Sequence, residues 1–245
     1  MLIGSKLNEY LAAIREMSQA NTFDKNHLLS KSFLIEKEKD IAMYYAPHNE
    51  YIETNARVVL VGITPGFSQM KTALESVASQ LDKQYSTEKL IKQAKIDASL
   101  AGQMRNNVIQ MLDACGLPNQ LRIETSAELF TTKRYALHTT SILKYPVFYK
   151  GKNYTGHQPK INQSPMLMRF AYKEFPKELH ALSNQAIIIP LGKMVEHVVN
   201  QLKDQLDEKH IIISGFPHPS GANGHRIQQF AANKQHITAL LEQIE

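Results

Sequence analysis

The feature that most constrains the fold of this chain is an uninterrupted apolar run that passes directly into a tight turn. Residues 58–67 read VVLVGITPGF. A strand with apolar side chains at every position is typical of a parallel sheet, because helices cover both faces of such a sheet. The turn holds a proline, which fixes φ, and glycines, which tolerate unusual backbone angles. The run therefore predicts a buried strand whose carboxyl end meets a rigid loop.

Three further segments predict strands, and helical patterns separate them. The strand segments read HTTSIL at 138–143, AIIIP at 186–190 and HIII at 210–213. Apolar residues at spacings of three and four predict helices over residues 5–20, over 104–115, after 192 and over 227–244. Strands that alternate with helices favour an α/β fold. We expect a three-layer α/β/α sandwich with a central, mostly parallel four-stranded sheet.

The length of 245 residues fits one domain over residues 1–245, and no internal repeat or linker divides it. Residues 1–50 are expected to form a helical segment packed on a core over 55–245. Within the first part, residues 22–56 predict a second helix followed by a loop. Residues 71–100, which are polar and rich in lysine, are expected to be helical in parts.

Composition excludes several classes of function. The single cysteine, Cys115, permits neither an internal disulfide nor a cysteine-ligated metal or iron–sulfur centre. No apolar run approaches the roughly 20 residues of a membrane span, and polar residues interrupt the N-terminus where a signal peptide would be apolar. We therefore expect a soluble cytoplasmic protein without a metal or cofactor. The formal net charge of +5 permits a polyanionic partner without requiring one.

Ligands of parallel sheets bind where strands end, so the loops leaving the strands are the candidate sites. The first loop, residues 63–70, could hold a phosphate through backbone N–H groups, although it lacks the P-loop pattern. Taken alone, the loop is explained more simply as an ordinary turn between a strand and a helix.

The last loop, residues 214–226, reads SGFPHPSGANGHR. Two prolines hold His218 rigidly, and a rigid histidine at a strand end can donate a hydrogen bond to charge that develops on a ligand. Ser220 and the nearby glycines would let backbone amides approach a phosphate. The alternative is a flexible surface loop.

Between these two loops, residues 144–158 mix tyrosine and phenylalanine with lysine. Aromatic rings beside lysines suit stacking on bases next to phosphates. The alternative is that the rings fill the edge of the core. The residues concerned are Lys144, Tyr145, Phe148, Tyr149, Lys150, Lys152 and Tyr154, with Lys160 just beyond.

Taken together, these loops resemble the uracil-DNA glycosylase superfamily, and most closely its broad bacterial family 4-like and mismatch-specific members. The resemblance rests on five segments in the right order over residues 55–230. They are VVLVGITPGF, GQMRNNVIQMLDACGL, LHTTSILKYP, IIIPLGKMV and GFPHPSGANGH. It implies an enzyme that flips a base out of double-stranded DNA and hydrolyses its N-glycosidic bond, leaving an abasic site.

The resemblance also implies a role for each residue that matches a motif. His218 would stabilise the leaving base, and Thr64 stands where the family places the group that handles the attacking water. The residues that would contact the base are Gly62, Ile63, Pro65, Gly66, Phe67 and Ser141. The residues that would contact the DNA backbone are Ser68, Lys150, Ser220, Gly221, Asn223 and Arg226. We expect a monomer acting on DNA.

Two residues depart from the family pattern. Thr64 replaces an acid or amide, and Ser141 replaces the asparagine that reads a uracil edge. Smaller side chains at both positions suit a bulkier modified pyrimidine, such as hypermodified phage cytosine, and therefore an anti-phage role. Asp97 or Glu75 could supply the missing carboxylate. Two alternatives stay open: a catalytically weak DNA-binding or damage-sensing module, and a nucleotide-handling enzyme unrelated to DNA.

Overall fold

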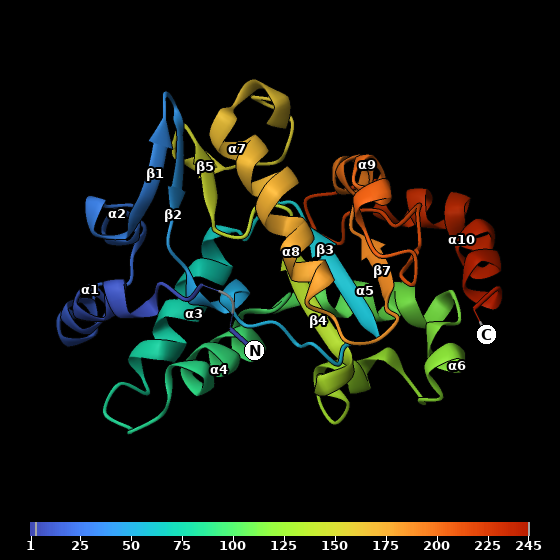
Figure 1. Cartoon of the computed structure of the whole chain (residues 1–245), viewed down its shortest axis with the longest axis horizontal. Coiled ribbons are helices and arrows are strands. Elements are labelled where there is room, and N and C mark those ends of the chain that lie inside the picture. The colour runs from blue at the N-terminus through green and yellow to red at the C-terminus, as the bar shows by residue number, and fades with distance from the viewer. Residues whose placement is uncertain (3, 245) are drawn as a thin grey trace. The chain divides into compact units, whose positions relative to one another are not determined.

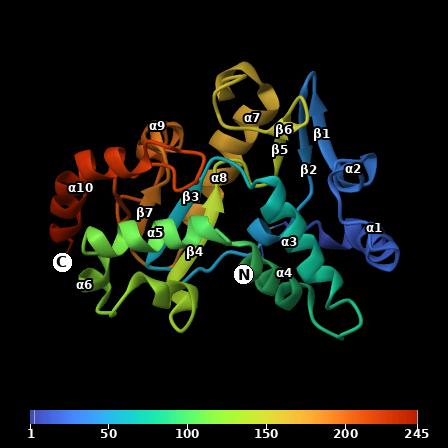
Figure 2. The same ribbon diagram turned by 180° about the vertical axis from the view of Figure 1, so that it is seen from behind.

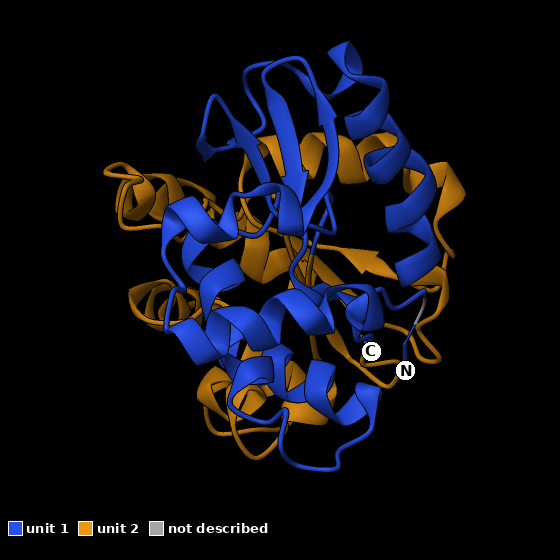
Figure 3. Cartoon of the chain, turned by 90° about the vertical axis from the view of Figure 1, so that its left-hand side faces the viewer, with its two compact units in different colours: residues 1–52, 63–99, 141–178 blue, residues 53–62, 100–140, 179–245 orange. Residues whose placement is uncertain are grey.

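The computed structural model describes residues 1–2 and 4–244. The chain forms two compact units, and each unit is assembled from three separate stretches (Figure 3). Unit 1 comprises residues 1–52, 63–99 and 141–178, and unit 2 comprises residues 53–62, 100–140 and 179–245. The expectation of a single domain over residues 1–245 stays a prediction.

Unit 2 is built on the parallel sheet that the apolar runs predict. Its strand order is β4-β3-β7-β8. Strand β3 pairs in parallel with β7, with Val58 opposite Ile187, and β7 pairs in parallel with β8, with Ile187 opposite Ile211. The strands are β3 (Val58–Gly62), β4 (Leu137–Ser141), β7 (Ile187–Pro190) and β8 (Ile211–Ile212). The prediction of an α/β fold with a central four-stranded, mostly parallel sheet is confirmed.

Helices cover this sheet and share one apolar core with it. Helix α5 lies across β3 and β4 in Figure 2, and its Val108 and Leu112 belong to the same buried cluster as Leu60. Helix α10 adds Ile237 and Leu241 to that cluster. The helices are α5 (Gln103–Ala114), α6 (Leu117–Leu121), α9 (Lys193–Gln201) and α10 (Arg226–Glu242), with 3-10 turns at Ser126–Phe130, Arg134–Ala136 and Lys203–Gln205.

Unit 1 contains a second sheet, and all three of its strand pairings are antiparallel. Its strand order is β1-β2-β5-β6. The sheet is visible in Figure 1 beside helix α7. The strands are β1 (Leu34–Glu38), β2 (Ile41–Tyr44), β5 (Val147–Tyr149) and β6 (Lys152–Asn153).

This sheet corrects two expectations. A helix followed by a loop over residues 22–56 is wrong, because a β-hairpin occupies residues 34–44. Residues 144–158 are not an extended loop either, because they form the hairpin of β5 and β6. Strand β1 carries polar side chains on both faces, so apolar and polar residues do not alternate clearly along it. The turn after it also lacks the Asn-Gly or Asp-Gly pair that would indicate a hairpin. The sheet is continued by β5, about a hundred residues later in the chain, and a local sequence pattern cannot predict so distant a pairing.

The remaining elements of unit 1 are mostly helical. Helix α3 (Phe67–Ala78) starts directly after the first loop, and α4 (Thr87–Ala98) follows it, as expected for residues 71–100. Helix α7 (Pro165–Arg169) continues through a π-helical turn into α8 (Phe175–His180), where Pro176 removes one helical hydrogen bond. The others are α1 (Leu7–Ala20), α2 (Lys25–Leu28) and the 3-10 turns Lys31–Phe33, Pro47–Glu50 and Ile161–Gln163. Among the described residues, no helix is long and apolar enough to span a membrane.

Unit 1 buries an unusual group of ionisable side chains. The Glu50 carboxylate is fully buried and accepts hydrogen bonds from Ser5 Oγ, the Lys6 backbone, Tyr45 Oη and Tyr145 Oη, at 2.8 to 3.2 Å. Four donors compensate for the loss of water around a buried carboxylate. Glu50 therefore ties the N-terminal segment to the start of the β5 hairpin.

His48 is buried in the same 3-10 turn as Glu50, and neither ring nitrogen has a hydrogen-bond partner among the described residues. Burial, together with the nearby positive charge of Lys95, lowers the pKa of His48 to about 3. The imidazole is therefore neutral in the folded protein at neutral pH.

The pH dependence of stability tests this burial. An unfolded histidine has a pKa of about 6.5, so below that pH the unfolded chain binds a proton that the folded chain excludes. Stability should therefore fall as pH falls from about 6.5 toward 3. His48→Leu should remove about 1.4 kcal/mol per pH unit from this slope. Urea unfolding at several pH values measures it, and parallel curves for both proteins would contradict the assignment.

Candidate functional site

The residues predicted to act on a ligand fall into two groups, one in each unit. The first loop, residues 63–70, together with Ser141 and Lys150, belongs to unit 1. Gly62 and the His218 loop, residues 214–226, belong to unit 2.

In the first loop, the Thr64 hydroxyl fastens two segments together. Thr64 Oγ1 donates to the Tyr145 carbonyl at 2.9 Å and accepts the Val147 N–H at 3.0 Å. The Leu143 N–H also donates to the Ile63 carbonyl at 2.9 Å. The loops that leave β3 and β4 therefore lie side by side, as expected of neighbouring parallel strands. One lone pair of the Thr64 hydroxyl remains for a water molecule.

The start of α3 is already capped by side chains of unit 1. The Gly66 N–H donates to Gln69 Oε1 and the Phe67 N–H donates to Asn153 Oδ1, both at 3.1 Å. These are two of the helix-end amides that could otherwise hold an anion. A phosphate would have to displace Asn153, so the proposed phosphate cradle is filled by the protein itself.

The other predicted residues of unit 1 differ in accessibility. Pro65 and Ser141 are buried, whereas Ser68 and Lys150 are exposed. The two candidate carboxylates are engaged elsewhere on the helices. Asp97 accepts hydrogen bonds from Ser76 at 2.6 Å and Gln93 at 2.8 Å, and Glu75 pairs with Lys71. A role for Asp97 or Glu75 as a general base stays a prediction.

In unit 2, the position and protonation of His218 follow from its contacts. The Ser220 N–H lies 3.2 Å from His218 Nδ1. A backbone N–H can only donate, so Nδ1 accepts and the neutral ring carries its proton on Nε2. Burial lowers the pKa of His218, which favours this neutral form. His218 is therefore a neutral hydrogen-bond donor through Nε2.

Two neighbouring segments fix the backbone on either side of His218. Asn107 of α5 is buried, and its Nδ2 donates to the Pro219 carbonyl at 2.8 Å. The Gly192 N–H donates to the Phe216 carbonyl, and a Cβ on Gly192 would lie 3.3 Å from the Cβ of His218. The Leu191-Gly192 segment that follows β7 thus leaves room for the histidine.

The rest of the His218 loop is held from inside and from the helices. Asn223 Nδ2 donates to the His218 carbonyl and Arg226 Nη1 donates to the Ser220 carbonyl, both at 3.1 Å. Glu196 Oε2 accepts the Gly215 N–H at 2.8 Å. These hydrogen bonds argue against the alternative interpretation of residues 214–226 as a flexible surface loop. Gly221 is exposed, and Ser220 uses its amide within the loop.

Several positioning residues were missed from the sequence. Asn107 lies four residues before Met111 on the buried face of α5, and a polar residue on an apolar face is a readable signal. The sequence marks Tyr145 only as one of several aromatic residues among lysines. Asn153 and Glu196 gave no local signal, because their partners lie far away in the chain. Among the described residues, no three His, Cys, Asp or Glu side chains are grouped as metal ligands.

The fold and these contacts define an α/β protein with polar, rigid loops at the carboxyl ends of its parallel strands. No family model matches the chain. A protein described as uncharacterized protein YoxB, from Bacillus subtilis (strain 168), is 45% identical over 234 residues, which cover 95% of this chain and 91% of that protein. The chain belongs to the same family as YoxB.

A solved structure, the crystal structure of wild-type SMUG2 from Pedobacter heparinus, is also similar. The similarity covers 95% of this chain and 98% of that chain, with a TM-score of 0.46 and 14% sequence identity. A likeness at this level assigns no chemistry to this chain, and the name of the Bacillus protein states none. The chemistry has to follow from the chain's own residues.

The packing of Gly192 against His218 gives a test of the site's construction. Gly192 has φ +98°, so Gly192→Ala would place a strained residue against the His218 side chain. We expect a loss of about 1–3 kcal/mol in the free energy of unfolding. Gly221→Ala is the matched control, since its added Cβ would meet no atom within 4 Å. Equal unfolding curves for the two variants would refute the contact.

Proposed function

We propose that the protein is a monofunctional DNA glycosylase, which hydrolyses the N-glycosidic bond of a flipped base and leaves an abasic site. The proposal rests on the family pattern of the five motifs and on the contacts of the His218 loop. The observation that carries it is the neutral imidazole of His218, with Nδ1 satisfied by the Ser220 amide and Nε2 as the donor.

The chemistry requires such a donor. When the bond between the sugar C1′ and the base nitrogen breaks, its electron pair leaves with the base, and the sugar becomes oxocarbenium-like. Negative charge then develops on the base oxygen, where a preorganised hydrogen bond lowers the barrier. Water adds to C1′ and releases a proton to solvent. A rigid, neutral donor suits this task, because it needs no reorganisation as the charge appears.

Thr64 limits what the first loop can contribute. A threonine hydroxyl is a very poor base, and this one already bonds to two backbone groups. It can orient a water molecule through its remaining lone pair. An oxocarbenium-like transition state needs little nucleophilic push, so orientation supports the proposed reaction.

The small side chains at Thr64 and Ser141 favour a bulkier base than uracil. Ser141 is buried at the end of β4 and offers one hydroxyl, where an amide would match both a donor and an acceptor on uracil. We infer a modified pyrimidine, such as hypermodified cytosine of phage DNA, and thus a role in defence. The enzyme would act as a monomer in the cytoplasm, without a cofactor.

Ile227 supports DNA as the substrate. Ile227 follows directly on the His218 loop at the start of α10, and it is 75% exposed. An exposed branched apolar side chain beside polar loops suits insertion into a base stack from which a nucleotide has been removed.

Loss of the His218 side chain tests the reaction. His218→Ala should lower the rate of abasic-site formation by about 10²–10³, the effect of removing one such donor. Duplex binding and the circular dichroism spectrum should not change. Undiminished product from a folded His218→Ala protein would exclude the proposed role.

A panel of duplexes tests the substrate. Each duplex carries uracil, a mismatch or a phage-type modified cytosine at one position, and abasic sites are counted after incubation. We expect product from the modified pyrimidine and little from uracil. Efficient release of uracil would remove the argument from Thr64 and Ser141.

A second candidate function is a DNA-binding or damage-sensing module without catalysis. The bonded hydroxyl of Thr64 favours it, because no carboxylate replaces the family's acid or amide at this position. It would bind DNA with steep salt dependence and give no abasic product on any duplex of the panel.

A further inference from the structure

The two hairpins of the antiparallel sheet end at the same edge of unit 1. Residues 39–40 join β1 to β2, and residues 150–151 join β5 to β6. Ile41, just after the first turn, lies opposite Tyr149, just before the second. The Lys150 N–H donates to the Asp40 carbonyl at 3.0 Å. We call this double turn, with Lys37 and Lys152 beside it, the hairpin tip.

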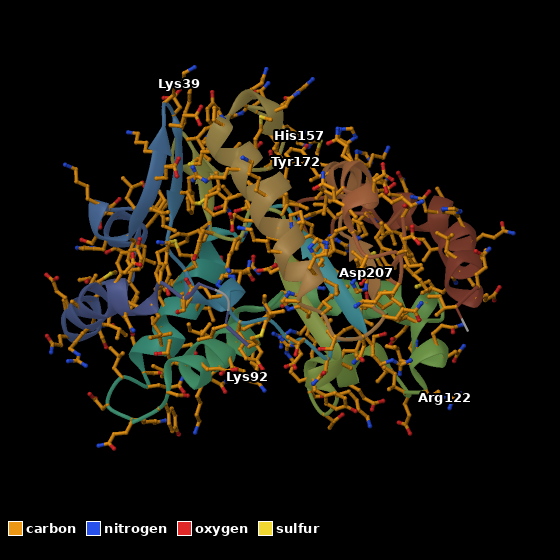
Figure 4. All side chains as sticks on the ribbon, in the orientation of Figure 1. Lys39, Lys92, Arg122, His157, Tyr172 and Asp207 are labelled. Atoms are coloured by element: carbon orange, nitrogen blue, oxygen red, sulfur yellow. The ribbon has the colours of Figure 1, made fainter. Side chains whose placement is uncertain are left out.

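The hairpin tip carries more basic than acidic side chains. Lys37, Lys39, Lys150 and Lys152 are exposed, and Asp40 is the acidic residue among residues 37, 39–40 and 150–152. Asp40 lies 3.6 Å from Lys150 Nζ, yet the Lys150 side chain is 62% exposed. Figure 4 shows Lys39 at the outer end of the first hairpin.

The neighbouring acidic residues of β1 are held against α7. Glu38 accepts hydrogen bonds from Ser164 Oγ at 2.7 Å and the Met166 N–H at 3.2 Å. Glu36 pairs with Arg169. The charge of Glu36 is thus balanced by Arg169. The partners of Glu38 are neutral and do not cancel a carboxylate charge, so four lysines stand against Asp40 and Glu38, and the tip keeps an excess of positive charge.

The backbone at the tip does not favour lysine. Lys39 has φ +53° and Lys150 has φ +50°, in the left-handed region that glycine and asparagine adopt far more easily. A turn chosen for stability would carry one of those residues. Lysine at both positions is therefore explained better by its charge than by the turn.

The tip is connected to the first loop through β6. Asn153 follows Lys152 directly, and its Oδ1 accepts the N–H of Phe67 at the start of α3. A polyanion held by the tip would thus be held next to residues that carry the base-contacting motif.

We propose that the hairpin tip is a phosphate-binding surface for the backbone of double-stranded DNA, in which Lys37, Lys39 and Lys152 add to the contact that the resemblance implies for Lys150. This rests on the proposed function only in that the substrate is DNA. Lysines at a protruding edge bind phosphates as point charges and release counterions, so they add affinity without sequence preference.

Salt-dependent binding to a fluorescent duplex tests the proposal. The variant is Lys37→Gln, Lys39→Asn and Lys152→Gln, in which asparagine suits the left-handed turn. Lys150 stays, because its backbone and side chain hold the turns together. Each lysine that contacts a phosphate contributes about 0.9 to the slope of log K against log salt. The variant should lose about 2–3 from this slope, and about 10- to 100-fold in affinity at physiological salt.

Two controls separate the tip from charge in general and from misfolding. Lys25, Lys31 and Lys173 are also exposed residues of unit 1, and changing all three to glutamine alters the net charge equally. This control should keep most of the slope. Lys37→Arg with Lys152→Arg should keep all of it.

The outcome does not depend on catalysis. A tip variant with the slope of the Lys25, Lys31 and Lys173 control would overturn the proposal even if the protein excises bases. Duplex binding lost at the tip, in a protein that yields no abasic site, would sustain the proposal and refute the glycosylase. Absence of duplex binding by the unaltered protein, as for a surface that takes an acidic protein, would overturn the proposal.

Discussion

The buried carboxylate of Glu50 is the interaction on which the geometry of unit 1 depends. It gathers the N-terminal segment, Tyr45 and Tyr145, and the carbonyl of that same Tyr145 receives the Thr64 hydroxyl. A charge so far from water is stable only while its donors stay in place, and removing a partner from such a group is strongly destabilising. The position of the first loop therefore depends, through Tyr145, on Glu50, a residue that no sequence motif indicates.

The His218 loop is organised by a different means, namely backbone bonds and close packing. Asn107 donates to the Pro219 carbonyl, and Gly192 has no side chain that would crowd His218. The Ser220 amide selects the tautomer of the ring. These three contacts involve no charged side chain, whereas Arg226 and Glu196 hold other parts of the loop. The proposed donor thus stays neutral because of burial and local hydrogen bonding, and its Nε2–H can donate a hydrogen bond to developing negative charge without a proton transfer.

Much of the fold was readable because the parallel strands are apolar throughout. The continuous apolar runs at Val58 to Val61 and Ile187 to Ile189 predict strands buried on both faces. In the helices between them, apolar residues recur at spacings of three and four. The antiparallel sheet was missed because β1 is half polar and its sheet is completed from β5. In the same way, His218 was found from its flanking prolines, whereas Asn153 and Glu50 act through distant partners. Local pattern predicts elements and loops, but long-range hydrogen bonds decide which side chains position them.

The assembly of each unit from three stretches has a consequence for how the protein is made. Unit 1 holds all of its residues once position 178 has been synthesised, while unit 2 still lacks β7, β8 and α10. The strand β3 emerges early and must wait for its partner β7, some 130 residues later, before its pairing is complete. The loop with His218 is among the last parts to leave the ribosome. A nascent chain therefore holds the whole of unit 1 before it gains the histidine, and no contiguous fragment of the chain contains either unit without residues of the other.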